Sequence, residues 1–147
     1  MSKEVETTRQ IGPKQAISAL KHCIDLQRPV MVWGAPGIGK SELVQGLVDQ
    51  GELGNALMID MRLALLEPTD LRGYPFRNPE NNQMEWSPPS DLPSQDLADS
   101  YDNVVLFLDE LNSAPPSVQA AAYQLVLNRR IGQYVLPDNV RIIAAGN

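Results

Sequence analysis

The chain has 147 residues, of which 43% are hydrophobic and 20% are charged, a composition typical of one globular domain rather than of a disordered segment. The net charge of −6 argues against broad electrostatic binding to nucleic acid or to an anionic membrane. Its single cysteine, Cys23, excludes an intrachain disulfide and fits a reducing, cytoplasmic setting. The sequence has no apolar run that approaches the length of a membrane span.

Helical and strand patterns alternate along the chain. After a polar lead-in over 1–10, which we expect to be flexible, the patterns predict helices over 13–27, 40–50 and 115–130, and apolar strands over 28–33, 55–61, 103–110 and 140–147. Such alternation is typical of an α/β domain with a mostly parallel sheet. In these sheets, ligands bind beyond the carboxyl ends of the strands. We therefore look for function directly after the apolar runs.

A region rich in Pro, Asn, Gly and Arg interrupts this alternation over 67–94. Within it, "GYPFRNPENNQMEW" predicts a β-hairpin whose turn is "PENN". The aromatic side chains Tyr74, Phe76 and Trp86 flank that turn. They could form a partner-binding tip, but we expect them to pack the hairpin onto the sheet.

A phosphate-binding loop follows the first predicted strand. Gly34, Gly39, Lys40 and Ser41 match the pattern G-x-x-x-x-G-K-[ST], and a helix is predicted to begin at Lys40. Glycines let the backbone N–H groups converge on an anion, and the helix adds its own unpaired N–H groups. Lys40 would place a positive charge on the β- and γ-phosphates, and the hydroxyl of Ser41 would coordinate Mg²⁺. A glycine-rich turn that matches by chance is the alternative.

An acidic pair closes the run "VVLFLDE". Two adjacent carboxylates at the end of a buried strand repel each other and lose hydration, and Mg²⁺ would offset both costs. We expect Asp109 to contact the metal, mainly through coordinated water, and Glu110 to activate the attacking water as a general base. Solvated carboxylates at a strand end are the alternative.

Asn147 ends the last apolar run, "IIAAGN". Its amide could hydrogen-bond the attacking water or the γ-phosphate. Taken alone, it would be an ordinary turn asparagine, and it gains interest only from the two sites predicted beside it.

These segments together resemble the AAA+ ATPases, with "GAPGIGKS" as Walker A, "VVLFLDE" as Walker B and "IIAAGN" as sensor one. "DMRLALLEPTDLRGYP" and "LDELNSAPPSVQAAAYQLVLNRRIGQYVLPDNV" are similar to the MoxR-like branch, which is grouped with the dynein-related AAA domains. The resemblance covers roughly residues 11–147. It implies a P-loop NTPase three-layer αβα sandwich.

The resemblance also implies the ligands and their binding residues. The cofactors would be ATP and Mg²⁺, with catalytic roles for Lys40, Glu110 and Asn147 and metal contacts from Ser41 and Asp109. The nucleotide-binding residues would be Gly34, Ala35, Pro36, Gly37, Ile38, Gly39, Lys40, Ser41 and Glu42, with Ile11 and Gly12 against the adenine.

The function that the family implies is Mg²⁺-dependent ATP hydrolysis by a homo-oligomeric ring, usually a hexamer, that remodels or chaperones a partner protein. The client is unknown and could be a protein with a von Willebrand factor A domain, since members of this branch often act alongside such proteins. Other readings are a nucleotide-dependent interaction module without efficient turnover, and a DNA-directed AAA+ component such as a loader or a restriction component. The acidic composition counts against the last of these.

The sequence departs from the family pattern after sensor one. The fifth core strand, the arginine finger and the helical lid are absent, so we expect residues 11–147 to be the N-terminal part of an AAA+ core. In the family's strand order (five, one, four, three, two), the run "PVMVW" would then be an exposed edge. We expect this chain alone to bind nucleotide weakly and to hydrolyse it poorly.

Overall fold

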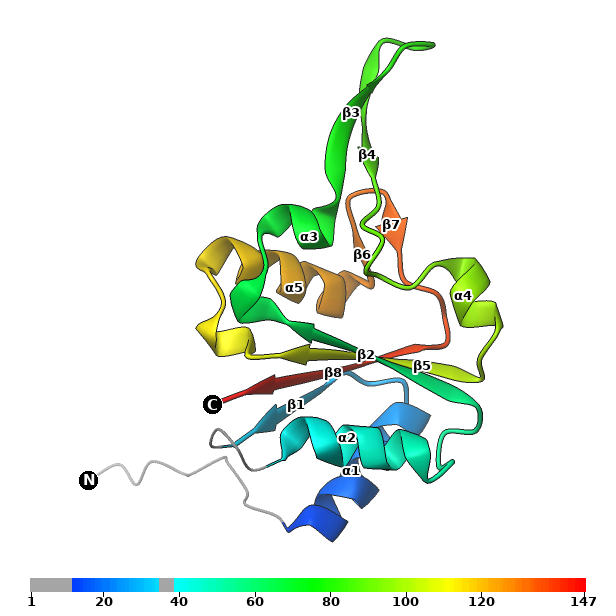
Figure 1. Ribbon diagram of the computed structural model, residues 1–147, viewed down its shortest axis with the longest axis vertical. Helices are drawn as coiled ribbons and strands as arrows, with labels where there is room; N and C mark the ends of the chain where they lie inside the picture. The colour runs from blue at the N-terminus through cyan, green and yellow to red at the C-terminus, as the bar shows by residue number, and fades with distance from the viewer. Residues whose placement is uncertain (1–11, 35–38) are drawn as a thin grey trace, which may run out of the picture.

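The computed structural model describes residues 12–34 and 39–147, and its centre is a parallel β-sheet between two layers of helices (Figure 1). Within these ranges the sheet has four strands in the order β1-β8-β5-β2: β1 (Val30–Trp33), β2 (Ala56–Arg62), β5 (Asn103–Asp109) and β8 (Val140–Gly146). The longer helices are α1 (Pro13–Asp25), α2 (Lys40–Asp49) and α5 (Pro116–Asn128).

Each face of the sheet buries its own apolar cluster, because successive strand residues point to opposite sides. Helices α1 and α2 cover one face, and α5 covers the other (Figure 1). The first cluster includes Leu20, Ile24, Val44, Leu47, Val105, Phe107 and Ile143, and the second includes Leu106, Leu108, Ala121, Leu125 and Ile142. The predicted three-layer α/β sandwich is confirmed.

Strand β1 lies at an edge of the sheet. Among the described residues it pairs only with β8, and its side chains are half-buried except for Trp33, which is 54% exposed. The predicted order of the four strands, with the first strand outermost, is therefore correct. The free edge presents backbone groups to which a further strand could pair.

The predicted β-hairpin is confirmed. Strands β3 (Tyr74–Asn78) and β4 (Gln83–Ser87) pair antiparallel, and "PENN" connects them. The prediction that its aromatic residues pack onto the sheet is wrong for Tyr74 and Phe76, which are 61% and 43% exposed. The physical reason is that the hairpin stands away from the sandwich (Figure 1), so only its base, where Trp86 lies close to Gly132, meets the body of the protein.

The remaining elements are short. Two small helices, α3 (Pro68–Arg72) and α4 (Gln95–Asp99), and two 3₁₀ turns, η1 (Leu63–Leu65) and η2 (Leu111–Ser113), are too brief to leave a helical period in the sequence. The segment after α5 forms a small antiparallel ladder from β6 (Arg130–Ile131) and β7 (Tyr134–Val135). No helix in the described ranges has both the length and the apolar character needed to cross a membrane.

The ends of two helices differ from the sequence prediction. Helix α1 ends at Asp25, and Gln27 beyond it has a φ of +56°. Helix α5 ends at Asn128 because Arg129 takes a φ of +54°. The guanidinium of Arg129 donates to the backbone oxygens of Pro137 and Val140 at 2.8 and 3.0 Å, so its role here is to tie the helix end to the start of β8.

Replacing Gly73 with alanine should destabilise the base of the hairpin. Gly73 has φ +86° and ψ −169°, a conformation that only glycine adopts readily, and a Cβ there would overlap the backbone oxygen of Ser87. We expect Gly73→Ala to lower the free energy of unfolding by about 2–4 kcal/mol, measured by urea denaturation. Gly46→Ala is the matched control, since nothing lies within 4 Å of its Cβ position in helix α2 and alanine favours a helix. An equal loss in both variants would contradict the explanation.

Tyr134 ties the β6–β7 ladder to the loop that precedes α4. Its buried hydroxyl donates to the backbone oxygen of Pro93 at 2.6 Å, and burial raises the pKa of Tyr134 to about 12 from its ordinary value of 10. Tyr134→Phe should lower the free energy of unfolding by about 1–3 kcal/mol, because the backbone oxygen of Pro93 loses its hydrogen-bond donor.

The raised pKa of Tyr134 also predicts a pH dependence. Between pH 10 and about 12 the unfolded tyrosine releases its proton while the folded one keeps it, so stability falls as the pH rises through this window. Urea denaturation at pH 9 and pH 11 should show that the free energy of unfolding falls more between the two pH values for the wild type than for Tyr134→Phe. Parallel losses in the two proteins would contradict the raised pKa.

Candidate nucleotide-binding site

The predicted site segments meet at one edge of the sheet. Strands β1, β5 and β8 are parallel, so their carboxyl ends lie together, and helix α2 begins at the same edge (Figure 1). The N–H of Gly34 donates to the oxygen of Gly146 at 3.1 Å and extends the pairing of β1 with β8 to the start of the loop. The chain thus brings the segment after β1 against the end of β8.

Lys40 is the most connected side chain at this edge. Its ammonium nitrogen Nζ donates to the backbone oxygens of Gly34 and Gly146 and to Oδ1 of Asn147, each at 2.9 Å. Lys40 therefore joins the loop after β1 to the end of β8 across more than a hundred residues of sequence. This ammonium group donates hydrogen bonds to neutral oxygens at the N-terminus of a helix. When a phosphate binds there, the group can donate to the phosphate oxygens in place of some of these partners.

Helix α2 begins at Lys40, and the glycine that precedes it lies in the left-handed region. Gly39, the N-cap of α2, has φ +80° and ψ +31°. Ser41 and Glu42 lie in the first turn, where the helix has unpaired N–H groups and the positive end of its dipole. A helix N-terminus that follows a strand and a glycine-rich segment of sequence is a common site for anions.

Some predicted nucleotide contacts lie outside the described residues: Ile11, Ala35, Pro36, Gly37 and Ile38. Gly12 is described and is the exposed N-cap of α1. Its N–H has a long, 3.4 Å contact to Oε1 of Gln15, within the first turn of its own helix. Its predicted contact with an adenine stays a prediction.

Asp109 is the last residue of β5, and Glu110 follows it at this edge. By the alternation of the strand, Asp109 shares the α1–α2 face with Val105 and Phe107. Its Oδ1 accepts a hydrogen bond from the N–H of Glu110 at 2.8 Å. Glu110 has φ +57° and ψ +38°, a left-handed conformation that costs a non-glycine residue about 1–2 kcal/mol. Such strain at a half-buried carboxylate is typical of functional positions.

Sequence reasoning missed a third carboxylate, Asp60, on the neighbouring strand β2. Its pKa is raised above the ordinary value, first by partial burial and then by the negative charges of Asp109 and Glu110, while Arg62 acts in the opposite sense. Arg62 is the register partner of Asp109. A cation bound beside Asp109 would relieve the repulsion among these three carboxylates.

The described residues hold no group of three or more His, Cys, Asp and Glu side chains arranged to bind a metal ion by themselves. This is compatible with Mg²⁺, which in phosphate sites usually takes one or two carboxylates and completes its shell with phosphate oxygens and water. Ser41 at the start of α2 and Asp109 at the end of β5 offer oxygens of the right kind for that arrangement.

Asn147 lies at the end of β8, and Asn112 from the turn η2 contacts it. The side-chain amide of Asn112 donates to the backbone oxygen of Asn147 at 2.9 Å and accepts from its N–H at 3.1 Å. Asn112 was not among the predicted site residues. The only sequence signal was its position two residues after Glu110, because a contact with the end of the chain is visible only once the strands are placed.

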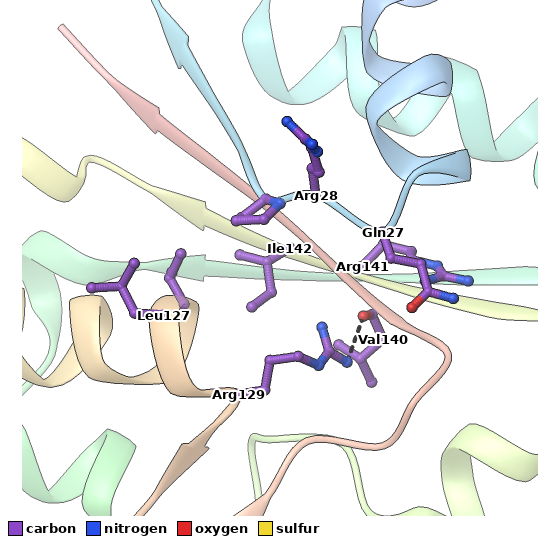
Figure 2. A pocket seen from close by; sticks show the side chains of 9 residues that line it. Gln27, Arg28, Leu127, Arg129, Val140, Arg141 and Ile142 are labelled. Carbon is purple, nitrogen blue, oxygen red and sulfur yellow. Dashed lines mark hydrogen bonds between the residues drawn. The ribbon is translucent and has the colours of Figure 1, made fainter.

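A pocket lies at the opposite end of the sheet, where β1 and β8 begin (Figure 2). Its volume is about 330 Å³, and arginines 28, 129 and 141 contribute to its wall. In Figure 2, Arg28 and Arg129 lie on opposite sides of β8. Arg141 donates through Nε to Oδ1 of Asn103 at 3.1 Å, and its buried Nη1 has no partner among the described residues. The pocket is therefore separate from the edge at which Lys40 and Asn147 meet.

Comparison with known proteins identifies the fold. No family model matches the chain, and no curated protein matches it significantly. A solved structure from Cytophaga hutchinsonii, provisionally named an ATPase, is similar with a TM-score of 0.63 and 21% identity over 93% of this chain. NtrX from Brucella abortus is similar with a TM-score of 0.56 and 16% identity over 96% of this chain.

The chain spans 39% of the length of the Cytophaga protein and 31% of NtrX. At these identities the likeness shows the fold alone. The fold is an α/β sandwich of the P-loop NTPase type, with a parallel four-stranded sheet in the described residues, as the sequence predicted.

Proposed function

We propose that the chain binds ATP with Mg²⁺ at the edge formed by the carboxyl ends of β1, β5 and β8, and that it contributes this site to Mg²⁺-dependent ATP hydrolysis. The observation that carries the proposal is the position of Lys40. Lys40 is the first residue of α2, and its Nζ donates to Gly34, Gly146 and Asn147. A lysine in this place, after a glycine-rich loop that matches the phosphate-binding pattern, is suited to hold the β- and γ-phosphates.

The roles of the other residues follow from their positions. Ser41 and Asp109 would hold Mg²⁺, which supplies charge neutralisation at the phosphates. Glu110 would accept a proton from the attacking water, since its carboxylate lies one residue beyond Asp109 and its strained backbone holds it at the strand end. Asn147, beyond the end of β8, would orient the attacking water or the terminal phosphate.

The finer part of the proposal is a MoxR-like AAA+ ATPase that acts on a partner protein as a ring. The four strands have the order expected of that core, and the free edge of β1 could pair with a fifth strand. The projecting hairpin exposes Tyr74, Phe76 and Met84, which offers apolar contacts to another protein. The client and the size of the ring are not specified by these features.

A binding titration tests the proposal. The chain is titrated with a fluorescent ATP analogue in the presence of Mg²⁺, and unlabelled ATP, ADP and inorganic sulfate then compete. We expect saturable binding that ATP and ADP displace and that millimolar sulfate does not. Absence of saturable binding at millimolar nucleotide would refute the proposed function.

A further inference from the structure

The side chain of Asn112 makes two hydrogen bonds to the backbone of Asn147, the residue that follows β8. Its Nδ2 donates to the backbone oxygen of Asn147 at 2.9 Å, and its Oδ1 accepts from the backbone N–H of the same residue at 3.1 Å. The planar amide therefore acts like one residue of a neighbouring strand. Asparagine and glutamine are the side chains that offer a donor and an acceptor in one such plane.

This pairing sets the position from which the side chain of Asn147 extends. Strand β8 ends at Gly146, so the backbone of Asn147 lies beyond the regular pairing of the sheet. With its backbone held by Asn112, Asn147 directs its Oδ1 to Nζ of Lys40 at 2.9 Å. A continuous path of hydrogen bonds thus joins the turn after Glu110, the end of β8 and the first residue of α2.

Gly146 leaves the space that this path needs. A Cβ at Gly146 would lie 2.9 Å from Oδ1 of Asn112, 2.8 Å from Cζ3 of Trp33 and 3.0 Å from Cε of Met31. These atoms are the ends of side chains, which can move. A substitution at Gly146 would therefore crowd the amide of Asn112 together with the side chains of Trp33 and Met31.

We propose that Asn112 is a positioning residue for Asn147. It fixes the backbone of Asn147 so that the Asn147 amide reaches Lys40 and, resting on the proposed function, the terminal phosphate of a bound nucleoside triphosphate. Asn112 itself touches neither the nucleotide nor the attacking water in this scheme. Its loss should therefore affect recognition of the third phosphate and leave contacts with the first two unchanged.

The first experiment requires no nucleotide. Hydrogen exchange of backbone amides is followed by NMR in the wild type, in Asn112→Ala and in Asn128→Ala, a control that removes an exposed asparagine at the end of α5. We expect the Asn147 N–H to exchange about tenfold faster in Asn112→Ala only, while the amides of β8 between Ile142 and Ala145 keep their rates. Equal Asn147 rates in the wild type and Asn112→Ala would overturn the proposal.

The second experiment measures discrimination between triphosphate and diphosphate. The ratio of the ADP and AMPPNP dissociation constants is determined for the wild type, Asn112→Ala, Asn147→Ala and the double variant. In both single variants we expect the ratio of the ADP dissociation constant to the AMPPNP dissociation constant to fall about tenfold. The affinity for ADP should change less than twofold. The double variant should have the same ratio as Asn147→Ala, because the two residues act as one unit.

These two readouts separate the positioning role from a structural one and from the proposed function. A change in melting temperature with an unchanged ADP/AMPPNP ratio in Asn112→Ala, together with a lowered ratio in Asn147→Ala, would overturn the proposal. If the wild type binds no nucleotide, the proposed function fails, and the exchange rate of the Asn147 N–H still decides whether Asn112 holds it.

Discussion

Replacing Lys40 with alanine should weaken binding of Mg²⁺–ATP by at least about a hundredfold, which corresponds to about 2.7 kcal/mol. The lysine is the one described side chain that contacts Gly34, Gly146 and Asn147 together. Charge-assisted hydrogen bonds contribute about 1.5–3 kcal/mol each, so loss of the ammonium removes enough energy for this effect. Binding is measured by titration with a fluorescent ATP analogue and by calorimetry.

Lys21→Ala is the matched control for this experiment. Lys21 lies on α1, where it forms an exposed ion pair with Glu52 at 2.7 Å, and that carboxylate raises its pKa. The control removes the same charge from the chain away from the edge where Lys40 lies, so ATP affinity should change less than twofold. Similar affinities for the wild type and Lys40→Ala would show that the ammonium does not contact the phosphates. Similar losses in Lys40→Ala and Lys21→Ala would instead indicate a general effect of charge.

Glu110→Gln should slow ATP hydrolysis by about 10²–10⁴-fold and leave ATP affinity nearly unchanged. The substitution keeps the size of the side chain and removes its ability to accept a proton. Glu110 lies beside Asp109 in a left-handed backbone conformation, which glycine would adopt with less strain. A strained carboxylate at such a position is typical of a functional residue. Hydrolysis is measured under single-turnover conditions with protein in excess over radiolabelled ATP, so that slow rates are detected.

The control for this substitution is Glu80→Gln in the turn of the hairpin, where no effect on hydrolysis is expected. The experiment also separates two functions. Retained ATP binding with no hydrolysis above background in the wild type would favour a nucleotide-dependent interaction module. Wild-type hydrolysis that persists unchanged in Glu110→Gln would remove Glu110 from the role of general base.

The main elements could be predicted from the sequence because their signals are local. The run "VVLFL" is apolar on both faces, as a strand buried between two helical layers must be, and the structure places it inside the sheet. The hairpin was visible from its turn residues and flanking aromatic side chains. The exposure of Tyr74 and Phe76 was predicted incorrectly, because a hairpin pattern does not specify whether the hairpin lies against the sheet or projects from it.

The candidate site was only partly predictable. Each of four site residues lies at the start or the end of an element, in a pattern that the sequence displays: Lys40, Asp109, Glu110 and Asn147. Asp60 and Asn112 carry no such pattern. The pKa of Asp60 is raised first by partial burial in the fold and then by the charges of Asp109 and Glu110 after the next strand, and the partner of Asn112 lies beyond the end of β8.

The sequence by itself determined the alternation of strands and helices, the phosphate-binding pattern and the acidic pair, because each depends on the order of neighbouring residues. The tertiary structure decided which strand ends lie side by side, that Lys40 contacts Asn147, and that Asn112 pairs with the backbone of Asn147. Those contacts join residues that are far apart in the chain. They arise only when the burial of two apolar faces fixes the order and register of the sheet.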